Sequence, residues 1–314
     1  ACYQGVGSQK CDCDETQYAL RLCRDRKRPV LPCTHQNAFW RCQRYVDKTH
    51  LGAENALIKA IAHRHTGAFV QRYTTCGVTK KIEICAANFD SAVAAAVAGA
   101  DRIELCSALD LGGLTPSAAL IRQAVLLSEL EVHVLIRPRE GHFVYSAKEV
   151  DIMAEDIAFC RSLGAAGVVT GVLQSDHRLD VAALNTLKAA AGSMPVSCHR
   201  AFDFTPDPFE ALETLIAAGF VRVLSSGQQA DAYTGRFLLR RLIEAAQGRI
   251  AVMPGSGIRL DNIRAIAEET GASDFHFTAK KRVVPDAGDL PGLEAGFQVS
   301  HVDLIREMIA YVRS

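Results

Sequence analysis

Two short segments of the sequence repeat the pattern Glu-x-Cys, which brings together residue types that bind metals or transfer protons. Glu83 and Cys85 alternate in one apolar run, and Glu104 and Cys106 alternate in the next. Because side chains alternate across a β-strand, each pair shares one face, and adjacent strands lie about 4.8 Å apart. Buried carboxylates need a cation, an arginine or a bound ligand, so this face is predicted to be a functional site. The alternative is that the glutamates fill a polar layer and the thiols are small core residues.

Further polar side chains stand near the ends of later apolar runs. Arg137 and Arg139 end the third run, and we expect them to neutralise the two glutamates. His199 and Asp203 share one face of the fifth run, and His276 lies on the eighth. Their convergence at one end of the strands favours a ligand-binding or catalytic pocket over simple packing.

Glycines follow the sixth and seventh runs. Gly255 and Gly257, in the segment PGSG, allow backbone N–H groups to approach a phosphate closely. We therefore predict a phosphate-binding turn there, and the alternative is a tight turn without a ligand.

A regular alternation of strands and helices positions these residues. Short β-branched runs alternate eight times with Ala- and Leu-rich segments of helical spacing over residues 81–314. The expected strands are 81–87, 102–107, 132–139, 167–173, 195–203, 221–227, 250–257 and 274–279. This rhythm predicts an α/β fold, a (β/α)8 TIM-type barrel, which takes about 250 residues. A doubly wound sheet is the main alternative, but the first run leads into no Gly-rich phosphate turn.

Local signals predict where several of these elements begin and end. Asp90 or Ser91, Thr115 and Asp207 are the expected N-caps of three helices. The Gly- and Pro-rich segment 282–298 is expected to be a loop that serves as a lid or a subunit contact.

Charge and cysteine content divide the chain near residue 80. Residues 1–80 carry a net charge of +7 and seven of the eleven cysteines, although the whole chain of 314 residues has 35 basic and 35 acidic side chains. We expect residues 1–80 to be an irregular, poorly ordered basic extension and residues 81–314 to be the barrel. The overall neutrality argues against nucleic-acid binding, and no apolar run is long enough for a membrane span. No signal peptide opens the sequence, so a cytoplasmic location is expected.

The segments ADRIELCSALDLGGLTPS (100–117) and HRAFDFTPDPFEAL (199–212) closely resemble the copper homeostasis protein CutC family. The resemblance extends over residues 81–314 and implies a cytoplasmic TIM-type barrel that forms a homo-oligomer, a dimer or tetramer, with a role in copper handling. It also implies that Cys85 and Cys106 are copper ligands, and Cu(I) favours such thiolates. The sequence places no His or Met at a recognisable metal-ligand spacing from either cysteine. The polar residues that match the family motifs are Glu83, Glu104, Arg137, Arg139, His199, Arg200, Asp203 and His276.

Two functional hypotheses follow. The first is a copper homeostasis protein that binds Cu(I) through the two cysteines inside the barrel. The alternative is an enzyme that acts on a small anionic or phosphorylated metabolite, with Glu83 or Glu104 as general base and His199 as general acid. In that hypothesis Arg137 clamps the anion and the glycine turn holds its phosphate. A purely structural role leaves the cluster of ionisable groups unexplained.

Overall fold

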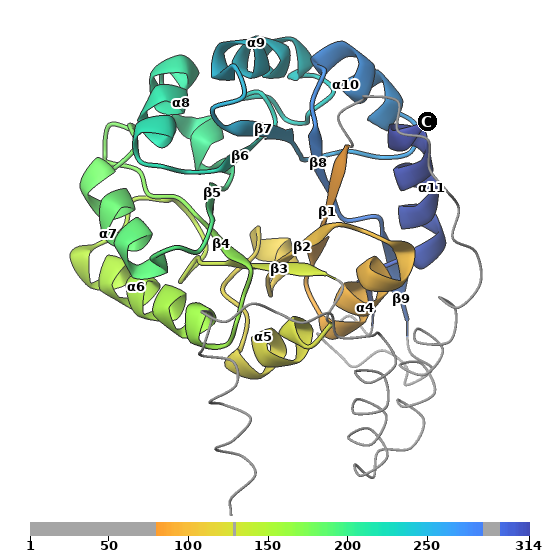
Figure 1. Cartoon of the computed structure of the whole chain (residues 1–314), viewed down its shortest axis with the longest axis horizontal. Coiled ribbons are helices and arrows are strands. Elements are labelled where there is room, and N and C mark those ends of the chain that lie inside the picture. Colours follow the sequence, from red (N-terminus) through yellow and green to blue (C-terminus); the bar gives the residue numbers. More distant parts are fainter. Residues whose placement is uncertain (1–79, 128–129, 285–295) are drawn as a thin grey trace, which may run out of the picture. The chain divides into compact units, whose positions relative to one another are not determined.

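The computed structural model describes residues 80–127, 130–284 and 296–314, and its centre is a ring of eight parallel strands (Figure 1). The strands are β1 (Lys81–Ala86), β2 (Arg102–Leu105), β3 (Glu131–Leu135), β4 (Gly167–Thr170), β5 (Val196–Cys198), β6 (Arg222–Ser225), β7 (Ala251–Pro254) and β8 (Asp274–Phe277). Their hydrogen-bonded order is β7-β6-β5-β4-β3-β2-β1-β8, so within the described residues the ring is open only between β7 and β8. The predicted barrel is confirmed. The predicted extension, apart from Lys80, lies outside the described residues.

Each strand leads to an α-helix on the outside of the ring, as Figure 1 shows. The helices are α4 (Phe89–Ala98), α5 (Ala118–Val125), α6 (Ala147–Ser162), α7 (Val181–Ala191), α8 (Pro208–Ala217), α9 (Arg236–Ala246), α10 (Ile263–Thr270) and α11 (Val302–Arg313). Two short 3-10 helices, η1 (Leu109–Leu111) and η2 (Arg200–Phe204), lie in the loops after β2 and β5. The predicted N-cap of α8 is confirmed, because the Asp207 carboxylate accepts hydrogen bonds from the first turn.

Two predicted helix starts are wrong, because an earlier or later side chain makes the capping hydrogen bond. Helix α4 is capped by Asn88, whose side-chain oxygen accepts the N–H of Ser91, so Asp90 and Ser91 lie in the first turn. Helix α5 is capped by Ser117. The expected cap, Thr115, instead hydrogen-bonds to the backbone after β3 and ties the two loops together.

Side-chain alternation divides the strands into an outer and an inner face. The apolar side chains of β1 and β2 that point outward are fully buried in the core shared with the helices, namely Ile82, Ile84, Ile103 and Leu105. Burial of each such side chain contributes about 1.5–3 kcal/mol. Cys198 belongs to the same core, and burial raises its pKa to about 12, so it is an unreactive thiol. A separate inward-facing cluster contains Cys85, Cys106, Leu135 and Val169.

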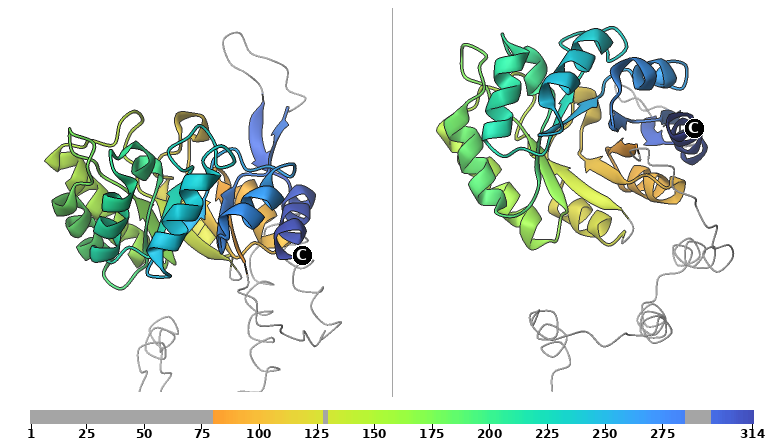
Figure 2. Two further views of the ribbon diagram at one scale, coloured as in Figure 1. Left: turned by 90° about the horizontal axis from the view of Figure 1, so that it is seen from above. Right: turned by 45° about the horizontal axis from the view of Figure 1, so that its top comes forward.

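An antiparallel hairpin follows β8 where the sequence predicts only a loop. Its strands are β9 (Lys280–Val283) and β10 (Phe297–Ser300), and Figure 2 shows them projecting from the barrel. The loop prediction is therefore wrong at both ends, because backbone pairing between distant segments does not leave a local signal. Residues 285–295 lie outside the described residues.

Candidate functional site

Two thiols meet at the top of β1 and β2. The Sγ atoms of Cys85 and Cys106 are 3.8 Å apart, and both side chains are buried. The register pairs Cys85 with Glu104, which brings the second carboxylate to the same level. The hydrogen bond with Cys106, burial and the nearby Glu104 raise the pKa of Cys85 well above its usual value. The predicted juxtaposition of the two Glu-x-Cys segments is confirmed.

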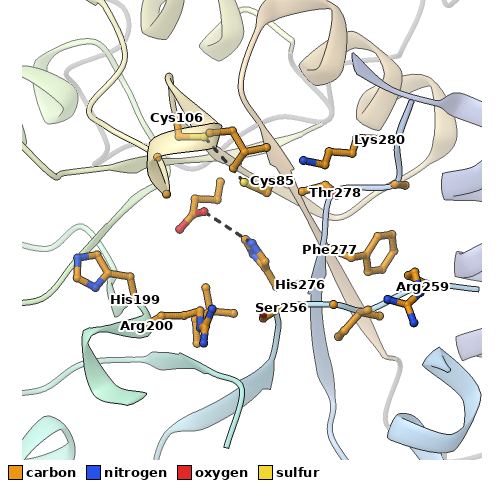
Figure 3. Close-up of a pocket in the computed structure, with 18 of the residues that line it drawn as sticks. Cys85, Cys106, His199, Arg200, Ser256, Arg259, His276, Phe277, Thr278 and Lys280 are labelled. Carbon is orange, nitrogen blue, oxygen red and sulfur yellow. Dashed lines mark hydrogen bonds and ion pairs between the residues drawn. The ribbon is translucent and has the colours of Figure 1, made fainter. Parts of the chain in front are cut away.

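A histidine from the strand that neighbours β1 joins this group. His276 lies on β8, which pairs directly with β1, and its Nε2 atom is 3.7 Å from the Glu104 carboxylate. One donor atom from each of Cys85, Glu104 and His276 lies within 4.8 Å of the other two, and all three side chains are buried. Cys85, Cys106 and His276 face one cavity in Figure 3. No metal-ligand spacing in the sequence indicated this histidine, because the residues meet only when the barrel closes.

Ionisation of these groups is set by burial and by their mutual charges. Burial raises the pKa of Glu104. Burial lowers the pKa of His276, but the charge of Glu104 and the hydrogen bond to Glu83 outweigh it, so that pKa lies above its usual value.

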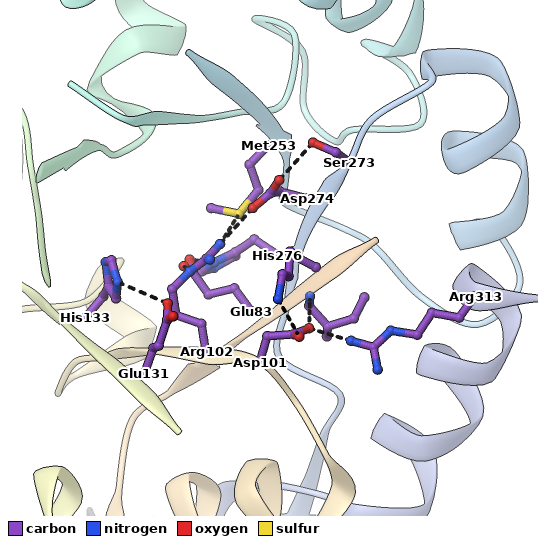
Figure 4. Close-up of polar contacts among 12 residues, drawn as sticks. Glu83, Asp101, Arg102, Glu131, His133, Met253, Ser273, Asp274, His276 and Arg313 are labelled. Atoms are coloured by element: carbon purple, nitrogen blue, oxygen red, sulfur yellow. Dashed lines mark hydrogen bonds and ion pairs between the residues drawn. The ribbon is translucent and has the colours of Figure 1, made fainter. Parts of the chain in front are cut away.

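Glu83 lies one layer deeper, and its arginine partner is not the predicted one. Arg102 donates to the Glu83 carboxylate and also to Asp274 at 3.1 Å, while Nδ1 of His276 lies 2.8 Å from Glu83 (Figure 4). Burial opposes ionisation of Glu83, but the hydrogen bond from His276 and the charge of Arg102 outweigh it, so its pKa lies below its usual range. The parallel register places Glu83 opposite Arg102, which is why this pair forms.

The expectation that Arg137 and Arg139 neutralise the glutamates is wrong. The Arg137 guanidinium donates to three main-chain carbonyls in the loops after β2 and β3, and it lies over the Phe143 ring. Arg139 pairs with Glu149 at the start of α6, on the outside of the barrel mouth. Both arginines extend beyond the end of β3, so they organise loops rather than reach the deeper carboxylates.

His199 and Asp203 do not share a strand face, because β5 ends at Cys198 and η2 follows. Nδ1 of His199 accepts the N–H of Ala201, and burial lowers the pKa of His199 to about 3, so the ring is neutral. Asp203 binds the backbone and hydroxyl groups of the loop after β6, including Ser226, and so fixes that loop. His199 lines the cavity, and Asp203 supports its wall.

The glycine turn after β7 splits into two different roles. The N–H of Gly255 donates to the carbonyl of Ser225, and a side chain there would collide with Leu224. Gly257 has a φ of +67°, which favours glycine, and it lines the cavity. Phosphate binding by this turn remains a prediction. Of its two glycines, Gly257 lines the cavity and Gly255 does not.

The cavity at the barrel mouth has a volume of about 920 Å³. Its floor contains Cys85, Glu104, Cys106 and His276. Its walls include apolar side chains such as Leu135 and Leu224, and Arg200, Arg259 and Lys280 also line it. Such an enclosure suits a small organic molecule with a negative charge.

Comparison with known proteins identifies the family. The sequence profile of the CutC family matches residues 80–281, which is more than half of the chain. The chain belongs to the CutC family. A CutC family protein of Chromobacterium violaceum is 49% identical over 204 residues, covering 65% of this chain and 83% of that protein. A human protein named copper homeostasis protein cutC homolog is 46% identical over 199 residues, covering 63% of this chain and 73% of that protein.

Solved structures agree with the fold. The CutC structure from Streptococcus agalactiae superposes with a TM-score of 0.62 at 34% identity, covering 64% of this chain and 99% of that one. An aldolase, QR15, gives a TM-score of 0.50 at 15% identity, covering 65% of this chain and 93% of that one, which is a likeness of fold alone. The part that matches the family profile, residues 80–281, contains Cys85 and Cys106. It also contains the network of Glu83, Arg102 and His276.

Sequence reasoning missed Arg102 and Asp274 at the starts of β2 and β8. Both lie at the lower end of the barrel, where polar residues usually serve stability. The one available signal was that each opens an apolar run, at positions 102 and 274, on the same alternating face as Glu104 and His276. No described helix of this CutC chain is long and apolar enough to cross a membrane.

Proposed function

We propose that this CutC chain takes part in copper homeostasis by binding Cu(I) between the thiolates of Cys85 and Cys106. The observation that carries the proposal is the 3.8 Å separation of the two buried Sγ atoms. A single ion with metal–sulfur bonds of about 2.3 Å spans such a distance without movement of the strands. Cu(I) is soft and prefers thiolates over oxygen ligands. The human relative's name, copper homeostasis protein cutC homolog, supports the same role.

The raised pKa of the Cys85 thiol sets a condition on this binding. Because the pKa of Cys85 lies well above its usual value, Cu(I) must displace a proton from it. The affinity for Cu(I) should therefore rise as the pH rises, and each ion bound should release protons.

An anaerobic titration of the full, reduced chain with Cu(I) against a chromophoric chelator tests the proposal. The seven cysteines of residues 1–80 add background binding, so the informative quantity is the change in stoichiometry. The Cys85→Ser, Cys106→Ser double variant should bind one Cu(I) fewer than the unaltered chain. A matched control, Cys160→Ser with Cys198→Ser, also removes two buried thiols and should keep that ion. Equal stoichiometry in the site variant and the unaltered chain contradicts the proposal.

The cavity supports a second candidate function. A volume of about 920 Å³ far exceeds what one metal ion needs, and the wall carries Arg200, Arg259 and Lys280. These features favour an enzyme acting on a small anionic or phosphorylated metabolite, with Glu104 and His276 as the proton-transfer pair. Arg137 is already engaged by backbone carbonyls, Arg200 is paired with Asp203 and Arg259 with Asp261, so Lys280 is the better anion clamp. A thermal-shift screen of phosphorylated and carboxylated metabolites tests this, and an absence of hits removes its support.

Three further expectations remain predictions. Assembly into a homo-oligomer, a dimer or tetramer, is supported by the family resemblance and is tested by light scattering of the full chain. A cytoplasmic location and a disordered basic extension over residues 1–80 are tested by fractionation and by limited proteolysis.

A further inference from the structure

We infer that Cys85, Glu104 and His276 form a mixed-donor site for a divalent ion of the Zn²⁺ class, with one coordination position open to the cavity. This site shares Cys85 with the proposed Cu(I) pair but does not depend on Cu(I) binding. One sulfur, one oxygen and one nitrogen donor, each from a different strand, converge within 4.8 Å of one another.

The spacing of the donors suits tetrahedral coordination. Bonds of about 2.0–2.3 Å at tetrahedral angles place neighbouring donor atoms about 3.3–3.8 Å apart. The separation between Nε2 of His276 and the Glu104 carboxylate is 3.7 Å, within that range. The group that meets the 4.8 Å spacing does not include Cys106, whose sulfur adjoins Cys85. The thiol pair and the mixed-donor group are therefore two overlapping sites with one common ligand.

The surroundings of His276 have the arrangement found around metal-binding histidines. The Glu83 carboxylate lies 2.8 Å from Nδ1 and orients the ring so that Nε2 faces Cys85 and Glu104, where it can ligate an ion that displaces its proton. Arg102 in turn fixes Glu83 from below, as Figure 4 shows. A carboxylate that orients a ligating imidazole in this way is the usual second layer of a zinc site.

Charge selects the ion. A Cys85 thiolate and a Glu104 carboxylate together carry two negative charges, which a divalent ion neutralises inside the barrel. A monovalent ion on the same three ligands leaves one net negative charge in a buried site, which is costly. Sulfur and nitrogen ligands favour Zn²⁺ over the hard ions Mg²⁺ and Ca²⁺.

Three protein ligands leave a fourth position, as in catalytic rather than structural zinc sites. All three ligands line the 920 Å³ cavity, so a water molecule or an oxygen atom of a small anion can reach that position. Lys280 lines the same cavity and can balance the charge of such a ligand.

Co²⁺ titration of the full, reduced chain under argon tests the inference, because Co²⁺ bound to a thiolate in a tetrahedral site absorbs strongly in the visible region. We expect one equivalent of this chromophore to depend on His276 and to be displaced by Zn²⁺. His276→Gln and Glu104→Gln should each abolish it, while Cys106→Ser should leave it intact. Glu83→Gln should weaken Co²⁺ binding about 10- to 100-fold. Added azide should shift the band if the fourth position is open.

The two metal proposals fail in distinguishable ways. Cys106→Ser should remove the barrel's Cu(I) and keep its Co²⁺, whereas His276→Gln should do the reverse. If His276→Gln and Glu104→Gln both keep the full Co²⁺ chromophore, or if Cys106→Ser removes it, the mixed-donor site is wrong whatever the Cu(I) result. Far-UV circular dichroism of each variant identifies any loss of signal that comes from unfolding. If His276→Gln unfolds, the Co²⁺ chromophore of the Glu104→Gln variant decides whether the mixed-donor site exists.

Discussion

Replacing Glu83 with glutamine should destabilise the barrel strongly, although the two side chains have nearly the same size. Glu83 is 2% exposed and Arg102 is 5% exposed, so neither charge is solvated when its partner is lost. Glutamine can still accept the hydrogen bond from His276, which isolates the effect of the charge. The variant therefore tests how much stability is lost when Arg102 stays buried without the Glu83 charge.

The magnitude follows from what remains around Arg102. Removing one partner of a buried ion pair costs about 3–5 kcal/mol, because the other charge stays buried. Asp274 still lies 3.1 Å from Arg102, so we expect the lower end of that range, about 3 kcal/mol. This corresponds to a roughly 150-fold change in the unfolding equilibrium constant.

Urea unfolding of the full chain, followed by far-UV circular dichroism, measures this change. The matched control is Glu213→Gln, since Glu213 makes the same kind of contact with Arg249 at 2.6 and 2.7 Å, but on the surface. Solvent and salt screen that pair, so the control should change the midpoint far less. If the two variants shift the midpoint equally, burial does not set the strength of the Glu83 ion pair and the reasoning is refuted.

Three other predictions concern stability. Burial lowers the pKa of His133 and of His199 to about 3, whereas these side chains bind protons near pH 6.5 in the unfolded chain. Between pH 7 and pH 5 the free energy of unfolding should therefore fall by about 2 kcal/mol per histidine. Urea denaturation at both pH values measures this fall, and His133→Asn should reduce it by about 2 kcal/mol. Gly167→Ala places a methyl group against the His133 ring and should cost about 1–3 kcal/mol, so an unchanged melting temperature contradicts the packing. Asn88→Ala removes the cap of α4 and a hydrogen bond to Gln298 and should cost about 1–2 kcal/mol, of which Asn88→Asp should recover the capping part.

Two overlapping sets of metal-binding side chains line the same cavity. The thiol pair suits a soft monovalent ion, and the Cys85, Glu104 and His276 group suits a borderline divalent one. Because both use Cys85, the two ions should compete. A Cu(I) titration in the presence of Zn²⁺ reports that competition directly.

Sequence alone determined the eight barrel strands, their alternation with helices and the inward face of β1 and β2. Alternation of apolar and polar residues is a local property, so it identified eight strands and put each glutamate on the same face as the cysteine two residues later. Local signals were weaker at boundaries, where Asn88 and Ser117 displaced the expected caps.

Only the tertiary structure decided which residues meet. Closure of the ring brings β8 beside β1 and places His276 next to Glu83 across 193 positions of sequence. The parallel register places Arg102, rather than Arg137, opposite Glu83. Local periodicity places these residues on inward faces but does not say which of them pair, because strand order and stagger are set by the whole barrel. The sequence supplied the chemical groups, and the closed barrel selected their partners.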